Sequence, residues 1–297
     1  MKKNFIITVL LILNLTSSNS ADFIKEKANQ KVNQKVNELA AHASEDIASY
    51  TQEAFGSIKY LDFNVNIQEH LKPSFNIMSV TEILKIKSGT VFNQTSLNIH
   101  DSDETINIGL GVRQLLNENK ILMGYNFFYD QQFNEGHERV GFGTELVSSI
   151  FDIRGNSYKA LSNGFRTTSE GSEKVLDGWD TQVDFHLPFN IDIFANAFKF
   201  KNPDHDSTYV EKGNKYGVNA SLGNFIFEGG YLDDNKKNDG YFGNIKFVLR
   251  LGNNKEKKKQ SFLKFEDVSD KLYQPVKREN KIRVVKISKS GVKVGGF

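Results

Sequence analysis

The stretch that decides the fold class is Ile106-Asn107-Ile108-Gly109-Leu110-Gly111-Val112-Arg113. Its apolar side chains occupy every second position, and asparagine, glycine and arginine fill the positions between them. Successive side chains of a β-strand point to opposite faces of a sheet, so this pattern predicts a strand with one apolar and one polar face.

The same alternation recurs on both sides of this stretch, from Ile58 to Leu251. Each run is about ten residues long, the length that a tilted strand needs to cross a bilayer. Short polar turns alternate with longer polar loops, which is typical of a meander of hairpins. We expect about twelve strands, at residues 57–68, 74–85, 88–100, 104–116, 120–132, 137–149, 151–162, 176–187, 191–201, 208–222, 225–234 and 239–251.

Alternation also fits a soluble β-sandwich, but three further features favour a membrane barrel. The polar face combines charged and amide residues with many glycines, which suits a water-filled lumen. Aromatic residues such as Tyr125, Phe127, Tyr129 and Trp179 cluster at strand ends, where the aromatic girdles of a membrane barrel lie. The third feature is a signal peptide.

The N-terminus has two lysines, an apolar run from Phe5 to Leu13, and small residues before Ala21. This arrangement is typical of a secretory signal peptide, with cleavage between Ser20 and Ala21. A membrane anchor would need about twenty apolar residues, more than this run provides. The sequence has no cysteine, so we expect no disulfide, zinc or thiol redox site.

Residues 22–55 carry apolar side chains three or four positions apart and contain no proline or glycine, which predicts a helix. An even number of strands puts both ends of a membrane barrel in the periplasm, so we expect the helix there. Two interpretations stay open. The helix packs on itself or on the barrel mouth, or it forms a coiled coil that makes a homodimer through residues 22–55.

Four more segments accompany the first: residues 122–130, residues 138–145, Gly178-Trp179-Asp180 with Leu187-Pro188 at the end of the same strand, and residues 276–282. In this order the five resemble the β-barrel of the inverse autotransporter family, the intimins and invasins. The resemblance covers residues 57–287 and implies an outer-membrane barrel of a Gram-negative bacterium that exports its own C-terminal part. The 297 residues leave no room for that family's peptidoglycan-binding domain or adhesive passenger, so adhesion is not expected.

In that family the chain after the last strand closes the periplasmic mouth with a short helix and then runs outward through the lumen. The resemblance implies a helix over residues 261–273, ending before Pro275, and an extended tail over residues 276–297. Some twenty extended residues reach about 70 Å, enough to span a bilayer. The alternative is a basic periplasmic tail that binds lipopolysaccharide or nothing.

The charge distribution fits a tail inside the lumen. Residues 252–297 contain 13 Lys or Arg and 5 Asp or Glu, a net charge of +8, whereas residues 21–251 carry a net charge of −8. Opposite charges attract more strongly in a partly desolvated lumen than in bulk water. We expect contacts between Asp62, Glu145, Asp180, Asp184 and Glu228 of the barrel and Lys277, Arg278, Arg283 and Lys286 of the tail.

The signal for barrel insertion is expected on the last strand and not at Phe297, because the residues just before Phe297 are too few and too rich in glycine for a strand. The signal is assigned to Gly243, Ile245, Phe247, Leu249 and Leu251.

No nucleophile elbow, P-loop, dinucleotide fingerprint or zinc-protease motif occurs in the sequence. The remaining groupings are His186 beside Asp184 and the loop Asp204-His205-Asp206. A hydrolase that uses His186 or His205, or a cation at the loop, is a weaker alternative. We expect no enzyme activity, no cofactor, no metal and, from the compartment, no nucleic-acid partner.

The sequence therefore divides into a signal peptide (residues 1–20), a periplasmic helical segment (21–56), a transmembrane antiparallel β-barrel (57–251) and a basic tail (252–297). We expect an all-β protein of the outer membrane that displays its own C-terminal segment. The alternative is a channel without a passenger, gated by its tail. Expected partners are outer-membrane lipid, lipopolysaccharide, the barrel assembly machinery and periplasmic chaperones.

Overall fold

The computed structural model describes residues 57–288 and 293–296, except residues 70, 101–102, 163, 169–170, 205–207, 237–238 and 252–262. The cleavage site at Ser20 and Ala21 and the helix predicted for residues 22–55 lie outside the described residues. Among the described residues, no helix has the length and apolar character that crossing a bilayer requires.

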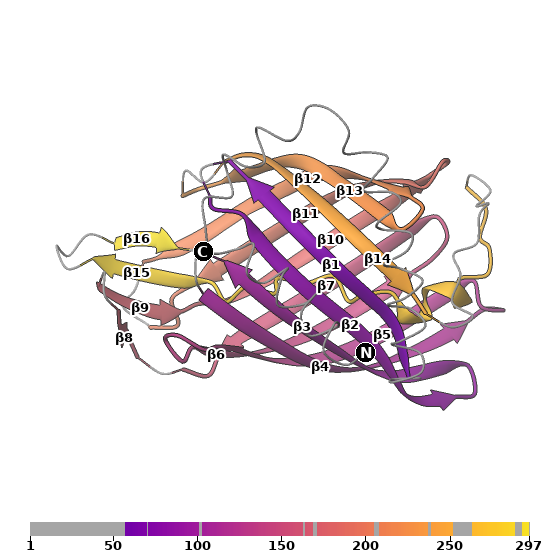
Figure 1. The fold of residues 1–297 in the computed structure, drawn as a ribbon, viewed down its shortest axis with the longest axis horizontal. Helices are drawn as coiled ribbons and strands as arrows, with labels where there is room; N and C mark the ends of the chain where they lie inside the picture. The colour runs from indigo at the N-terminus through magenta and orange to yellow at the C-terminus, as the bar shows by residue number, and fades with distance from the viewer. Residues whose placement is uncertain are drawn as a thin grey trace, which may run out of the picture. The chain divides into compact units, whose positions relative to one another are not determined.

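In this part of the chain, twelve antiparallel strands close into a barrel (Figure 1). Successive barrel strands pair as hairpins, and the first strand pairs with the last, so that no strand of the barrel has an open edge. The strands are β1 (Ile58–Gln68), β2 (Ser74–Ile86), β3 (Gly89–His100), β4 (Asp103–Leu116), β5 (Ile121–Gln132), β6 (Glu138–Val147), β7 (Phe151–Ala160), β10 (Asp177–Leu187), β11 (Ile191–Lys201), β12 (Val210–Leu222), β13 (Phe225–Asp234) and β14 (Gly240–Arg250).

The predicted fold class, an antiparallel barrel of about twelve strands, is confirmed. Every strand end lies within two residues of its predicted place. The alternation of β4 separates the two faces as expected: Leu110 is 55% exposed on the outside, and Arg113 is 0% exposed in the lumen. An apolar outer face and a polar inner face are what a membrane barrel requires.

The connections at the two ends of the barrel differ in length. The end with short connections, called the turn end, has residues 87–88, 117–120, 148–150, 188–190 and 223–224. The opposite end, called the loop end, has the longest connection, residues 161–176 between β7 and β10. β1 begins and β14 ends at the turn end, as an even number of strands requires.

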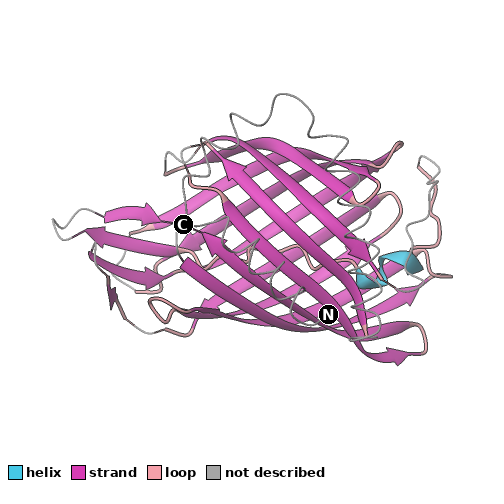
Figure 2. Ribbon diagram, in the orientation of Figure 1, coloured by secondary structure: helices cyan, strands magenta, loops and turns pink. Residues whose placement is uncertain are grey.

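A second, four-stranded sheet lies at the loop end (Figure 2). β8 (Arg166–Thr167) and β9 (Gly171–Val175) come from the β7–β10 connection, and β15 (Val284–Ser288) and β16 (Lys293–Gly296) come from the tail. The strand order is β16-β15-β9-β8. The sequence does not predict this sheet, because its strands are short and pair across distant parts of the chain. The expectation that the residues just before Phe297 form no strand is wrong, because β16 pairs there with β15.

The helix predicted over residues 261–273 is wrong in its length and type. Within the described residues 263–273, only η1 (Ser269–Tyr273) is helical, as a five-residue 3-10 helix, and residues 263–268 are irregular. Their backbone bonds to barrel turns instead: the Val268 N–H donates to the Asn119 carbonyl at 2.8 Å, and the Glu266 N–H donates to the Ser149 hydroxyl at 2.9 Å. These bonds satisfy groups that a longer helix would pair internally.

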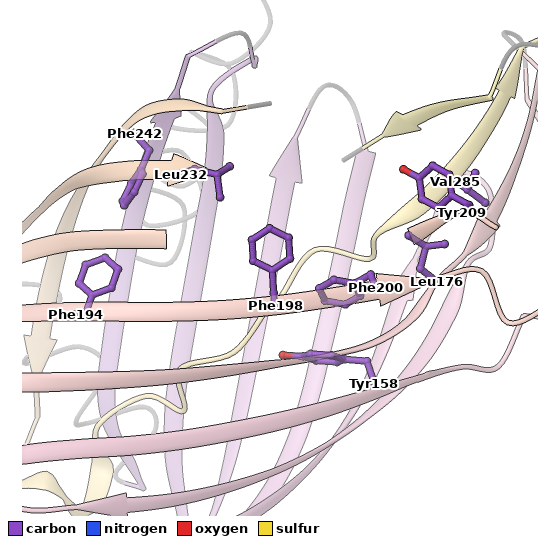
Figure 3. Packing of buried hydrophobic residues seen from close by; sticks show 9 residues of the cluster. All are labelled: Tyr158, Leu176, Phe194, Phe198, Phe200, Tyr209, Leu232, Phe242 and Val285. Carbon is purple, nitrogen blue, oxygen red and sulfur yellow. The ribbon is translucent and has the colours of Figure 1, made fainter. Parts of the chain in front are cut away.

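Aromatic rings fill part of the lumen along one wall (Figure 3). Elsewhere in the lumen a ring lies on a glycine: a Cβ on Gly111 would come within 2.3 Å of Phe92 Cζ, so that position requires glycine. The wall cluster packs against a residue of the tail, Val285. Its members are Tyr158, Leu176, Phe194, Phe198, Phe200, Tyr209, Leu232, Phe242 and Val285.

Candidate functional site

The lumen wall contains its own buried ion pairs. Arg113 and Arg154 are at most 2% exposed. Arg113 Nε lies 2.5 Å from Glu145 Oε1, and Arg154 Nη1 lies 2.7 Å from Asp184 Oδ2. An unpaired charge is costly to bury, so each carboxylate offsets the desolvation of an arginine on a neighbouring part of the wall.

The tail contacts the turn end through η1 and the residues beside it. Lys271 Nζ donates to the Ser148 carbonyl at 2.6 Å. Arg113 of the wall donates to the carbonyls of Leu272 at 2.8 Å and Gln274 at 2.5 Å. These bonds fix the start of the tail at the barrel mouth where β14 ends.

Residues 276–280 of the tail contact the lumen wall mainly through their backbone. The Val276 N–H donates to Gln94 Oε1 at 2.7 Å. Asn107 Nδ2 donates to the Asn280 carbonyl at 2.9 Å. Backbone groups are the same in every residue, so these bonds do not depend on the side chains of the tail.

At the loop end the tail becomes part of the four-stranded sheet. β15 pairs with β9 in an antiparallel register from Val284 opposite Val175 to Ser288 opposite Gly171. Lys286 Nζ lies 2.9 Å from Glu173 Oε1 across this pair. Burial alone would raise the pKa of Glu173, but hydrogen bonds with His137 and Lys286 lower it below its ordinary value.

The structure brings one predicted pair of tail and wall residues together: Lys277 Nζ lies 2.7 Å from Asp184 Oδ1. The other three predicted tail cations meet carboxylates outside the predicted set. Arg278 pairs with Asp130 at 2.7 Å, Arg283 pairs with Glu211, and Lys286 pairs with Glu173.

The remaining predicted acids lie elsewhere in the lumen. Glu145 pairs with the wall arginine Arg113, and Asp180 accepts hydrogen bonds from Tyr158 and from Asn156 Nδ2. Asp62 and Glu228 line a cavity beside the tail, and no ion pair joins them to the described part of the tail.

That polar cavity has a volume of about 280 Å³. Barrel residues from β1, β2, β3 and β10–β14 form one side, and residues 275–281 and 283 of the tail form the other. The tail therefore leaves part of the lumen open.

The residues predicted as the insertion signal lie on β14 or directly after it. Ile245 is 50% exposed on the outer face, whereas Leu249 and Leu251 are each 3% exposed. The apolar outer face of this strand is thus exposed near its middle and covered at its C-terminal end. Gly243 and Phe247, the other residues of the set, also lie on β14. The role of these five residues in barrel insertion stays a prediction.

Asp130, Glu211 and Glu173 were not among the predicted site residues. Asp130 follows the outward-facing Tyr129, and Glu211 lies five positions before the outward-facing Tyr216, so strand alternation could have placed both in the lumen. No comparable signal exists for Glu173, because its strand β9 is not predicted.

His186 lies at the turn end, where its Nε2 is 3.1 Å from Asp152 Oδ1. His186 Nδ1 lies 2.6 Å from Asp192 Oδ1, and its Nε2 lies 2.9 Å from Lys271 Nζ, so His186 contacts the tail at the turn end. Its sequence neighbour Asp184 bonds to other groups. His205 lies outside the described residues. Among the residues that are described, no three His, Cys, Asp or Glu side chains gather as metal ligands would.

A family description, inverse autotransporter beta-domain, matches residues 14–280 of this sequence. The chain belongs to the inverse autotransporter family. It is accordingly a β-barrel of the outer membrane, and the predicted family and location are confirmed.

Individual relatives agree with this family. The chain is 32% identical to an intimin of Citrobacter freundii over 99 residues, 33% of this chain and 10% of the intimin. It is 28% identical to the uncharacterized protein YchO of Escherichia coli K12 over 128 residues, 38% of this chain and 27% of YchO. The chain thus spans about a quarter or less of the length of these relatives.

A solved membrane-protein structure, from a study of in-meso crystallization, has the same fold. It superposes with a TM-score of 0.65 at 19% identity and covers 77% of this chain and 99% of its own.

Proposed function

We propose that this inverse autotransporter barrel passes its own C-terminal segment through its lumen and displays it at the cell surface. The observation that carries the proposal is the course of the tail. Lys271 contacts the turn end, Asn280 contacts the lumen wall, and β15 pairs with β9 at the loop end.

The direction of the tail follows from the lengths of the connections. In bacterial outer-membrane barrels the short turns face the periplasm and the longer loops face the cell exterior. The turn end is therefore assigned to the periplasm and the loop end to the cell surface. A tail that contacts first the turn end and then the loop end runs outward.

The bonds of the lumen wall suit a translocated chain. Wall side chains such as Gln94 and Asn107 bond to the tail backbone, so they can bind segments of different sequence as these pass. Wall carboxylates such as Asp184 and Asp130 attract the basic side chains of the tail. Both features favour export of a basic segment.

An epitope appended after Phe297 tests the proposal on intact cells. We expect antibody binding without permeabilisation, and loss of the epitope on treatment with external protease. The matched control places the same epitope at Phe189, which is 92% exposed in the β10–β11 turn and is assigned to the periplasm. If both epitopes need permeabilisation, the tail is not displayed.

A second candidate is a channel whose tail narrows the lumen, and the cavity of about 280 Å³ beside the tail favours it. This candidate predicts measurable ion conductance of the full chain in a planar bilayer, with a several-fold increase when residues 263–297 are deleted. Absence of conductance in both proteins would remove the candidate.

The proposal includes the partners that insertion of such a barrel requires. These are periplasmic chaperones, the barrel assembly machinery, outer-membrane lipid and lipopolysaccharide. Dimerisation through residues 22–55 stays a prediction.

A further inference from the structure

Two tail arginines each pair with a barrel carboxylate beside two aromatic rings. In the first pair, Asp130 accepts two parallel hydrogen bonds from Arg278, at 2.8 and 2.7 Å. The Arg278 guanidinium carbon lies 4.2 Å from the ring centroid of Phe128 and 5.4 Å from that of Tyr158. The Arg278 side chain is 1% exposed. We call Asp130, Phe128 and Tyr158 the first socket.

The second socket, five residues farther along the tail, contains Glu211, Phe198 and Phe200. Glu211 accepts a hydrogen bond from Arg283, and Glu279 of the tail accepts two more, at 3.1 and 2.8 Å. The Arg283 guanidinium carbon lies 4.4 Å from the Phe198 centroid and 4.9 Å from the Phe200 centroid. Both rings are labelled on β11 in Figure 3.

The tail lysine next to the first socket meets simpler surroundings. Lys277 pairs with Asp184, and its side chain is 37% exposed. None of the ring contacts found among the described residues involves Lys277. A carboxylate alone accepts either kind of cation, whereas a socket with aromatic faces favours a flat one.

We propose that the lumen has two guanidinium-selective sockets, at Asp130/Phe128/Tyr158 and Glu211/Phe198/Phe200, that fix the register in which the tail stops. The inference deepens the proposed function and rests on it for its biological meaning. Backbone bonds to the tail fit more than one register, because every tail residue except Pro275 presents the same groups. Two arginines five residues apart fit both sockets at one register only.

The physical reason is the shape of the arginine side chain. A planar guanidinium donates two parallel hydrogen bonds to one carboxylate and stacks on an aromatic face at the same time. A lysine ammonium keeps the charge but is a compact, strongly hydrated group without a flat face. Lysine in a socket should therefore lose most of the register selectivity while retaining the net charge.

A disulfide between β9 and β15 measures the register in the full chain, which has no cysteine of its own. Ser172 and Ile287 face each other in this strand pair, so Ser172→Cys with Ile287→Cys should oxidise readily. Val285 faces Lys174 instead, so Ser172→Cys with Val285→Cys reports a slip of two residues along the same face. Both yields are measured in outer membranes, and heat-modifiable gel mobility identifies the folded barrel.

Arg278→Lys combined with Arg283→Lys is expected to lower the in-register yield by roughly tenfold and to raise the slipped yield, as loss of one good charge-assisted contact would do. The matched control is Lys264→Arg, an exposed tail lysine outside both sockets, which should change neither yield. Wild-type yields in the lysine variant would overturn the proposal.

A second variant leaves the tail unchanged and alters the socket, so the proposal stays testable if the lysine variant assembles poorly. Phe198→Leu with Phe200→Leu keeps apolar bulk and Glu211 but removes both aromatic faces. We expect the same shift toward the slipped disulfide. An unchanged ratio would refute the role of the rings.

This readout separates the sockets from display of the tail. An in-register disulfide that depends on arginine, with an epitope after Phe297 that stays inaccessible, would support the sockets and contradict display. A displayed epitope with a register indifferent to arginine would do the reverse.

Discussion

Single buried side chains determine how the lumen binds the tail. Arg113 is the clearest case, because one guanidinium pairs with Glu145 and also donates to two carbonyls of the tail. A residue with these contacts couples the stability of the wall to the docking of η1.

Replacing Arg113 with methionine should destabilise the folded barrel. The change leaves Glu145 buried, with only Arg154 at 3.6 Å to offset its charge, and the expected cost is about 3 kcal/mol. The measurement is the denaturant midpoint of the barrel in lipid vesicles. Adding Glu145→Leu removes the carboxylate that has lost its partner and should recover most of the lost stability. A double variant as unstable as the single one would contradict this explanation.

The sequence predicts the contacts of single residues less well than it predicts the strands and the barrel. The polar register places Asp62, Glu145, Asp180 and Asp184 in the lumen correctly, since alternation fixes the face of each residue. It does not predict which residues form ion pairs, because the pairing depends on which strands are neighbours and on how far the tail extends along the lumen. Of the predicted acids, only Asp184 pairs with a tail cation among the described residues.

The outer faces of the barrel strands contact lipid. Two positions on the outer face of β4 test this contact. Leu110→Lys puts a charge on the outer face near the middle of the strand and should destabilise the barrel by about 2–4 kcal/mol. Gln114→Lys, on the same face close to the turn end, should cost about 0–1 kcal/mol. Unfolding in lipid vesicles measures both. Equal effects would mean that Leu110 does not face the hydrocarbon core.

The pairing of β15 with β9 should weaken in acid. The pKa of Glu173 is lowered from its ordinary value of 4.5, so its contribution is complete above pH 4.5 and is lost as the pH falls through the lowered pKa. Amide hydrogen-exchange protection of residues 284–288 measures the effect, relative to β4. Glu173→Gln should abolish this pH dependence. Protection that falls equally in both proteins would assign the effect to other groups.

Elements of the barrel are predictable and those of the tail are not. Each barrel strand has about ten alternating residues, a signal long enough to read locally. β15 exists because β9 offers an edge to pair with, and residues 263–268 are irregular because barrel turns bond to their backbone. Such tertiary contacts leave no local pattern in the sequence.

The whole molecule combines an acidic barrel with a basic tail. Residues 252–297 carry a net charge of +8, and five tail cations at described positions form ion pairs with barrel or loop-end carboxylates. Complementary charge over the length of the lumen favours a tail inside the barrel over a tail free in the periplasm. The central claim is therefore that the tail crosses the membrane inside the barrel and ends at the cell surface.

Single-cysteine labelling of intact cells with a membrane-impermeant maleimide tests this claim most directly. The variants are Phe297→Cys at the end of the tail, Leu263→Cys at the turn end, and Phe133→Cys, 50% exposed in the β5–β6 loop, as the surface control. The claim predicts labelling at positions 297 and 133 and, at position 263, labelling only after permeabilisation. Labelling at 133 alone, with 297 reacting only in permeabilised cells, would contradict it.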